Sequence, residues 1–257
     1  MGIFDFHKAI VREPGRSVVN GLRTGSGAPR REAVATQHRA YVAALRQCGL
    51  EVDVLPPLEE FPDSMFVEDP ALVFAEGAIL LRPGAPSRAA EAETMRPVLH
   101  RHFPRVLDLE EGVHVDGGDV LVTSREVFVG LSGRTSGRGA ESVCRQLRKF
   151  GREAKVVEAP PEVLHLKSAS SLIAEDTVLL TRSLADRGVF DGFRIVVTPE
   201  DEEAAANAVR IRDKVLMDER CPRTIDLVCR EGLAVMALTV RDVALLDAGL
   251  SCMSLRW

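Results

Sequence analysis

The stretch YVAALRQCGLEVDVL, residues 41–55, has the form of a helix that ends in a turn and runs directly into a strand. Its first part is an amphipathic helix, Gly49 stops that helix, and alternating apolar residues then restart the chain as a strand. The same signature recurs at residues 98–109, 146–157, 191–198 and 226–238. Successive turn residues lie 40 to 55 positions apart: Gly49, Pro104, Gly151, Gly192 and Gly232.

This spacing predicts a chain built from similar units of about fifty residues, each burying its apolar face against its neighbours. Strand-rich stretches such as DVLVT and TVLLT fill the remaining sequence, so each unit is expected to hold several strands and one helix. Five such units can close into a ring, which removes exposed sheet edges. An ordinary α/β sheet with regularly spaced helices has the same signature, and periodicity alone leaves both architectures open.

Composition favours a folded, water-soluble protein. The 257 residues are 46% hydrophobic and 28% charged, and no apolar run approaches the ~20 residues that cross a bilayer. The first residues, MGIFDFHKAIVREPG, lack the features of a signal peptide, so a cytoplasmic location without a membrane is expected. The net charge is −5 and Lys and Arg are scattered, which argues against a nucleic-acid partner.

The cysteines argue against two kinds of site. There are five, at positions 48, 144, 221, 229 and 252, and no two form a C-x-x-C pair. An odd number at wide spacing disfavours both a disulfide framework and a thiolate zinc site. Each cysteine is therefore a buried filler or a reactive thiol. Cys252 lies in a short strand-like run near the C-terminal Trp257.

A polar group follows each helix-to-strand signature, in apolar or glycine-rich sequence: Glu68 and Asp69, Asp116, His165, Asn207 and Cys252. If the five units are equivalent, these groups converge near one axis. Plainer interpretations stay open, because Asp-Gly-Gly is often only a turn and His165 between two leucines is often a core residue. Two adjacent carboxylates point to opposite faces of a strand, so Glu68 or Asp69 enters the interior unless the pair lies in a turn.

Together these groups favour attack by a thiol on a cationic carbon. A cysteine nucleophile needs a neighbouring base, and a histidine oriented by a carboxylate supplies one. Extra acids oppose thiolate formation unless the electrophile is itself a cation, and a planar guanidinium fits carboxylates well. Its charge also stabilises the thiolate. Loss of an amine leaves a thiouronium on Cys252, which water releases, with no metal and no cofactor.

Several segments resemble the motifs of the pentein superfamily of guanidine-modifying enzymes, most closely its dimethylarginine dimethylaminohydrolase family. They are MFVEDPALV, LLRPGAPSR, DGGDVL, FVGLSGRTS, LHLKS, AAAN and DAGLSCMS, between residues 63 and 254. The resemblance implies a five-bladed α/β-propeller of pseudo-fivefold ββαβ repeats around a central active site, with residues 1–257 as a single domain. It also implies hydrolysis of Nω-methylated arginines to citrulline and a methylamine. A homodimer stays open.

The resemblance implies roles position by position. It implies Cys252 as the nucleophile, His165 as general acid and base, and Asp116 as the acid that orients the histidine. The implied substrate contacts are Asp69 and Glu68 at the guanidinium, Asp63 near the amino-acid end, Phe66 along the side chain, Arg88 and Arg134 at the α-carboxylate, and the backbone near Asp247 at the α-amine. Leu22 would cap the pocket from the glycine-rich segment 18–29, which is otherwise a plain surface loop.

Other functions remain open at this point. An arginine deiminase-like hydrolase uses the same groups, although typical members are longer, as are amidinotransferases. The substrates differ by a methyl group or two, worth only ~1–3 kcal/mol in an apolar pocket, so the sequence does not separate them. A non-catalytic guanidine-binding protein would keep the acids and arginines but tolerate loss of Cys252 or His165, and the presence of both argues against it.

Overall fold

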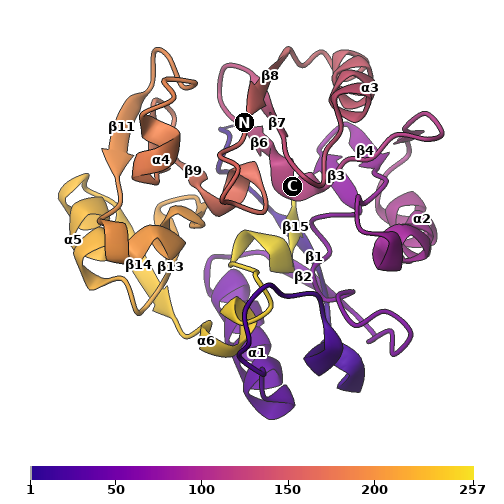
Figure 1. The fold of residues 1–257 in the computed structure, drawn as a ribbon, viewed down its shortest axis with the longest axis horizontal. Coiled ribbons are helices and arrows are strands. Elements are labelled where there is room, and N and C mark those ends of the chain that lie inside the picture. The colour runs from indigo at the N-terminus through magenta and orange to yellow at the C-terminus, as the bar shows by residue number, and fades with distance from the viewer. Residues whose placement is uncertain (1) are drawn as a thin grey trace.

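The computed structural model describes residues 2–257, which form five three-stranded sheets arranged around a common centre (Figure 1). In each sheet the middle strand pairs antiparallel with one neighbour and parallel with the other. The sheets, with the innermost strand first, are β15(Leu255–Arg256)-β1(Lys8–Arg12)-β2(Glu51–Leu55), β3(Ala71–Phe74)-β4(Gly77–Leu80)-β5(Val106–Asp108), β6(Val120–Val122)-β7(Val127–Leu131)-β8(Ala154–Glu158), β9(Ser170–Ala174)-β10(Thr177–Leu180)-β11(Arg194–Val197) and β12(Val209–Ile211)-β13(Lys214–Asp218)-β14(Ala234–Leu238).

One helix joins the middle strand of each sheet to its outer strand, because a parallel pair needs a crossover connection. These helices are α1(Arg31–Gln47), α2(Ala89–His102), α3(Gly137–Arg148), α4(Arg182–Ala185) and α5(Pro222–Arg230). A further short helix, α6(Arg241–Ala244), precedes the last inner strand. Each unit therefore has several strands and one helix, as the helix-to-strand signatures predicted, and is the ββαβ repeat that the family resemblance implied.

The two ends of the chain complete one unit together. The C-terminal strand β15 pairs antiparallel with β1, with Ala9 opposite Arg256 and Ile10 opposite Leu255. The inner strands meet at the centre, where β3 contacts β15 and β9 contacts both β6 and β12. The ring that periodicity left undecided is therefore closed, and the predicted five-bladed α/β-propeller is confirmed.

The hydrophobic cores lie between neighbouring units. One cluster joins Leu172 and Val178 of the β9 sheet to Leu121 and Phe128 of the β6 sheet. The cluster that closes the ring packs helix α1 against strands β12 and β13 of the last sheet. The remaining clusters each join two adjacent units in the same way. Each repeat thus buries its apolar face only when both neighbours are present.

The polar residues singled out in the sequence occupy corresponding places. Asp69, Asp116, His165, Asn207 and Cys252 each lie two to five residues before an inner strand begins. Because the inner strands surround one axis, these side chains come from five units to one end of the ring. Their placement is the structural basis of the site described below.

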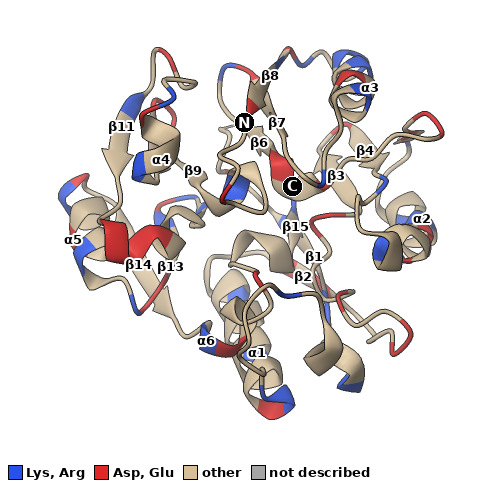
Figure 2. Cartoon of the chain, viewed as in Figure 1, with Lys and Arg blue, Asp and Glu red and all other residues tan. Residues whose placement is uncertain are grey.

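One local expectation was wrong: Cys252 lies in the 3-10 turn Ser251–Met253, and a strand begins only at Leu255. Glu68 and Asp69 lie in a turn before β3, the alternative that the sequence had left open. No helix among residues 2–257 is long and apolar enough to cross a membrane. Lys, Arg, Asp and Glu are scattered over all the units rather than gathered on one (Figure 2).

Candidate active site

A pocket of about 130 Å³ lies where the residues before the inner strands meet. Most of the residues predicted for the site line it: Leu22, Asp63, Phe66, Asp69, Arg88, Arg134, His165, Asp247 and Cys252. Asp116 and Glu68 do not line the pocket. Asp116 contacts His165 from behind, and Glu68 faces the other side of the turn that carries Asp69.

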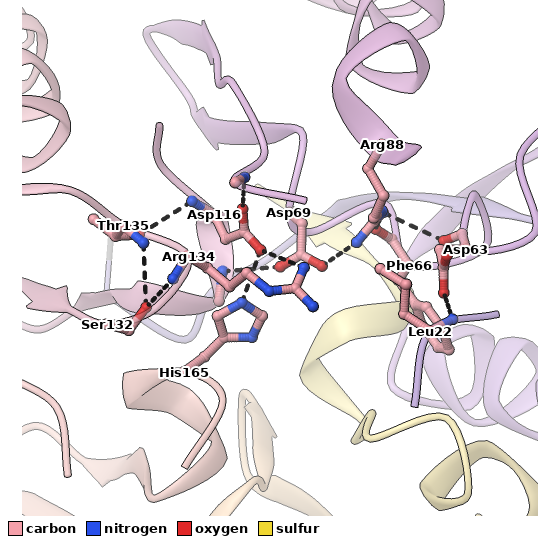
Figure 3. A network of polar contacts seen from close by, with 12 residues as sticks. Leu22, Asp63, Phe66, Asp69, Arg88, Asp116, Ser132, Arg134, Thr135 and His165 are labelled. Atoms are coloured by element: carbon pink, nitrogen blue, oxygen red, sulfur yellow. Dashed lines mark hydrogen bonds and ion pairs between the residues drawn. The ribbon is translucent and has the colours of Figure 1, made fainter. Parts of the chain in front are cut away.

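His165 and Asp116 form a buried pair (Figure 3). His165 Nε2 lies 2.9 Å from Asp116 Oδ2, and Asp116 is completely buried. Burial disfavours the imidazolium, but Asp69, the hydrogen bond to Asp116 and the charge of Asp119 outweigh it and raise the pKa of His165 to about 9. The histidine is therefore protonated at neutral pH and able to act as an acid.

Gly118 gives the imidazole its room. A Cβ at this position would lie 2.5 Å from His165 Nδ1, so a side chain here would displace the ring. Gly118 N also donates a hydrogen bond to Asp69 Oδ1 at 3.2 Å. The Asp-Gly-Gly turn thus places a carboxylate behind the histidine and a backbone donor beside Asp69, which a simple surface turn would not do.

Cys252 lies partly exposed in the wall of the pocket. Burial, followed by the charges of Glu68 and Asp69, raises the pKa of its thiol to about 12. The nearest donor to its Sγ is Gly249 N at 3.5 Å. The pocket therefore has a neutral thiol and an imidazolium in its wall, and added positive charge would favour the thiolate.

Asp69 is the carboxylate that faces the pocket. It forms an ion pair with Arg88, which also binds Glu91, and all three side chains are buried. Although burial opposes ionisation, Arg88 and His165 keep the pKa of Asp69 below its usual value. The pocket thus holds a fixed negative charge next to the thiol.

Glu68 points away from the pocket. Its Oε1 accepts a hydrogen bond from Lys167 Nζ at 2.6 Å, and its Oε2 accepts one from Ser251 Oγ at 2.7 Å. The two adjacent acids therefore do face opposite ways, although they lie in a turn. In this structure Glu68 contacts the segments that carry His165 and Cys252, and a direct guanidinium contact from it stays a prediction.

Comparisons with known proteins agree with this geometry. The family model described as arginine deiminase matches residues 54–215. The dimethylarginine dimethylaminohydrolase of Pseudomonas aeruginosa is 36% identical over 98% of this chain and 100% of its own. The Streptomyces coelicolor enzyme of the same name is 34% identical over 97% of this chain and 96% of its own.

The chain belongs to the dimethylarginine dimethylaminohydrolase family. A solved structure of the Pseudomonas aeruginosa family member, a cysteine-to-serine variant complexed with citrulline, matches with a TM-score of 0.96, 36% identity and coverage of 99% of this chain and 100% of that one. A histidine-to-glycine variant solved as an adduct with S-methyl-L-thiocitrulline has a TM-score of 0.95 at 35% identity, covering 98% and 100%. The N-terminal domain of a cyanobacterial arginine dihydrolase, only 18% identical with a TM-score of 0.87, shares the fold.

In this family member the glycine-rich segment closes over the pocket through two acids. Asp63 Oδ1 accepts a hydrogen bond from Leu22 N at 2.9 Å (Figure 3). The Asp247 carboxylate accepts hydrogen bonds from Thr24 N at 2.6 Å and Thr24 Oγ1 at 3.2 Å. Hydrogen bonds therefore attach segment 18–29 to the rim of the pocket. Asp247 contributes to this attachment through its side chain.

Arg88 and Arg134, the two arginines predicted to bind the α-carboxylate, differ in how many hydrogen bonds they already make within the protein. Arg88 donates to Asp69, to Glu91 and to the carbonyls of Asp63 and Phe66. Arg134 lies 3.8 Å from Asp116, and among residues 2–257 its guanidinium makes no hydrogen bond. Arg134 thus has more donors available for an anion, whereas Arg88 holds Asp69 in place.

Three further residues hold the site together and were not predicted from the sequence: Glu91, Lys167 and Asp119. Glu91 is the second acid on Arg88, and Lys167 is the cation on Glu68. Asp119 is fully buried and accepts hydrogen bonds from Leu166 N, Ser132 Oγ and Thr135 Oγ1. Asp119 and Lys167 lie in the motifs DGGDVL and LHLKS, whereas Glu91 had no signal in the sequence.

One group of three side chains has the spacing of metal ligands. Among residues 2–257, ligand atoms of Asp69, Asp116 and His165 lie within 4.8 Å of one another. However, Asp69 already binds Arg88 and Gly118 N, and Asp116 also accepts a hydrogen bond from Gly84 N at 2.6 Å. The absence of a metal stays a prediction, supported by these existing partners.

Proposed function

We infer that this protein hydrolyses Nω-methylated arginines to citrulline and dimethylamine or methylamine through a covalent intermediate on Cys252. The observation that carries this conclusion is that Cys252, the pocket-facing Asp69 and the His165–Asp116 pair meet at one small pocket. The citrulline complex of the Pseudomonas aeruginosa relative and the S-methyl-L-thiocitrulline adduct of a dimethylarginine dimethylaminohydrolase variant support the same chemistry.

The proposed reaction begins with binding of the substrate cation beside Asp69. Its positive charge offsets the carboxylates that keep the pKa of Cys252 near 12, so the thiol releases its proton to solvent. The sulfur then attacks the guanidinium carbon, forming a C–S bond. As the C–N bond breaks, the imidazolium of His165 gives its proton to the departing amine.

Hydrolysis of the intermediate reverses the role of His165. The amine leaves with one proton, so His165 is neutral and takes a proton from an incoming water. The hydroxyl adds to the thiouronium carbon, the C–S bond breaks, and citrulline is released with its ureido oxygen derived from water. Asp116 keeps the ring oriented throughout and stabilises the imidazolium before amine loss and after water attack, through its contact with Nε2.

We propose the remaining contacts from the geometry. Arg134, with donors unengaged among residues 2–257, binds the α-carboxylate, and Arg88 assists mainly by holding Asp69. Phe66 lies along the substrate side chain, Leu22 caps the pocket, and Asp63 and the backbone near Asp247 lie at the amino-acid end. A single domain over residues 1–257 and a cytoplasmic location stay predictions, and a homodimer stays open.

Product identification tests the function directly. The purified protein is incubated with asymmetric dimethylarginine, and citrulline and dimethylamine are quantified by mass spectrometry. We expect the two products in equal amounts. Binding without turnover would support a guanidine-binding protein instead.

Arginine deiminase-like activity is the second candidate, favoured by the family model that matches residues 54–215. The same assay with unmethylated arginine separates the two. We expect a higher kcat/KM for the methylated substrate. Release of ammonia from arginine at an equal or higher kcat/KM would favour the deiminase.

A further inference from the structure

Of the five equivalent residues Asp69, Asp116, His165, Asn207 and Cys252, Asn207 alone has no role in the proposed reaction. It is 9% exposed, follows the 3-10 segment Glu200–Ala206 and precedes β12. It does not line the substrate pocket. Its position is nevertheless equivalent to those of Asp69, Asp116, His165 and Cys252 in the other units, so its contacts bear on the site.

The amide of Asn207 joins the segment of the nucleophile to the segment of the histidine. Its Oδ1 accepts a hydrogen bond from Ser251 N at 2.9 Å, and its Nδ2 donates to Lys167 O at 2.9 Å and to Ser251 Oγ at 3.1 Å. A backbone N–H only donates and a carbonyl only accepts, so these partners fix which way the amide points. Ser251 precedes Cys252, and Lys167 lies two residues after His165.

These contacts form part of a closed cycle of hydrogen bonds, called the polar ring below, between Glu68, Lys167, Asn207 and Ser251 of four units. Ser251 Oγ donates to Glu68 Oε2, Lys167 Nζ donates to Glu68 Oε1, and the carbonyl of Lys167 returns to Asn207. Glu68, Ser251 and Lys167 are each next to, or two residues from, a residue that lines the substrate pocket. On the other side, Glu68, Lys167 and Ser251 line a second cavity of about 550 Å³. The polar ring therefore separates the two cavities as the floor of the active site.

The backbone of Gly249, three residues before Cys252, also packs directly against Asn207. A Cβ at Gly249 would lie 2.4 Å from Asn207 Oδ1, so only glycine allows this approach. Gly249 N in turn donates to Cys252 Sγ at 3.5 Å. Asn207 thus packs against Gly249, and Gly249 N donates to the Cys252 sulfur. A shift of the Asn207 side chain would therefore move the N–H that faces the sulfur.

We propose that Asn207 is a positioning residue that fixes the Cys252 sulfur relative to His165 by tying Ser251 to the Lys167 backbone. This assignment rests on the proposed function for its kinetic consequence. Asn207 does not touch the substrate, so it acts through the geometry of the nucleophile. Displacement of a reacting atom by about 1 Å can cost about 100-fold in rate.

The test compares Asn207→Ala with Ser142→Ala. Ser142 is a fully buried hydroxyl on α3 that accepts a hydrogen bond from Glu110 N, so its loss matches a buried polar deletion away from the site. For Asn207→Ala we expect kcat for asymmetric dimethylarginine to fall about 10- to 100-fold with KM within about threefold. Ser142→Ala keeps the parental kcat and KM.

A second measurement follows the thiol without any turnover. Alkylation of Cys252 by iodoacetamide is measured against pH in a Cys229→Ser background, because Cys229 is exposed. The charged groups that face the thiol, Glu68, Asp69, Lys167 and His165, are unchanged in Asn207→Ala. Loss of the Gly249 donor should move the midpoint of the profile to higher pH, whereas a purely structural role leaves the profile of the folded protein where it was.

The outcomes are separable. If folded Asn207→Ala retains both the parental kcat and the parental alkylation profile, the proposal is overturned. If it does not fold, Asn207→Asp keeps the size of the side chain and the acceptor for Ser251 N but loses the donor to Lys167 O, and an unchanged kcat and profile there overturns the proposal equally. If the parent protein does not turn over dimethylarginine but the alkylation profile shifts, the proposed function fails while the positioning role stands.

Discussion

His165 Nε2 lies 2.9 Å from Asp116 Oδ2, although 49 residues separate them in the sequence. The contact joins two adjacent units of the ring, because Asp116 precedes β6 and His165 precedes β9. A buried carboxylate at this distance keeps the imidazole charged and leaves Nδ1 as the ring nitrogen that Asp116 does not engage. The closed propeller thus brings Asp116 next to His165 and keeps the histidine protonated, although no local motif joins the two residues.

Replacing the nucleophile should separate chemistry from binding. In Cys252→Ser the hydroxyl has a much higher pKa than the thiol, so turnover of asymmetric dimethylarginine is expected to fall below detection. Ligand affinity, measured by calorimetry with citrulline, should stay within a few-fold of the parent. Residual turnover at a rate comparable to the parent would rule out a covalent role for this residue.

A bound cation should lower the pH at which the thiol reacts. The free site has the pKa of Cys252 near 12 because burial, Glu68 and Asp69 oppose the thiolate. A guanidinium ligand without a leaving group, positioned beside Asp69, should move the midpoint of Cys252 alkylation toward neutral pH. Asp69→Asn removes one opposing charge, so its ligand-free midpoint should already lie lower. An unchanged midpoint on ligand addition would contradict substrate-assisted thiolate formation.

Removing the less engaged arginine should weaken recognition of the carboxylate. Loss of a charged hydrogen bond costs about 1.5–3 kcal/mol, so Arg134→Leu should raise KM about 10- to 100-fold. A substrate analogue without the α-carboxylate should show no such increase. Arg138→Leu, an exposed arginine on α3, serves as the matched control. Equal losses with both substrates would place Arg134 elsewhere in the mechanism.

Releasing the loop should make it accessible to a protease. Asp247 has a positive φ of 53°, which glycine adopts without strain, so Asp247→Gly removes the carboxylate and keeps the backbone. Loss of its two contacts to Thr24 should speed tryptic cleavage after the exposed Arg23 about tenfold. Cleavage elsewhere should be unchanged. A cleavage rate equal to that of the parent would show that Asp247 does not hold the loop.

Much of the fold was predictable because it is local. A helix, a turn and a strand recur along the chain, and the turn residues Gly49, Gly151 and Gly232, just after their helices, have positive φ. In the fourth unit the helix already ends at Ala185, so Gly192, also with positive φ, only precedes the strand. The polar residues before each inner strand also had a sequence signal, since they interrupt apolar segments. Their convergence followed only from the assumption that the units are equivalent, which the ring bears out.

The remaining features depend on contacts between distant segments. Thr24 and Asp247 are 223 residues apart, and Lys167 and Glu68 are 99 apart. Neither pairing leaves a pattern in one sequence. The direction in which Glu68 points, and the engagement of Arg88 by Glu91, depend on side-chain packing within a turn and a helix start. The orientation of these side chains is determined by the residues packed around them and not by the residue type alone.

Mass spectrometry of His165→Gly with asymmetric dimethylarginine tests the central claim most directly. Without the histidine the thiouronium should form slowly and hydrolyse more slowly still, so it accumulates. We predict that the peptide containing Cys252 gains the mass of the substrate cation less dimethylamine, and that the adduct disappears in Cys252→Ser. Continued turnover with no adduct on that peptide, or an adduct on another residue, would contradict attack by Cys252 on the guanidinium carbon.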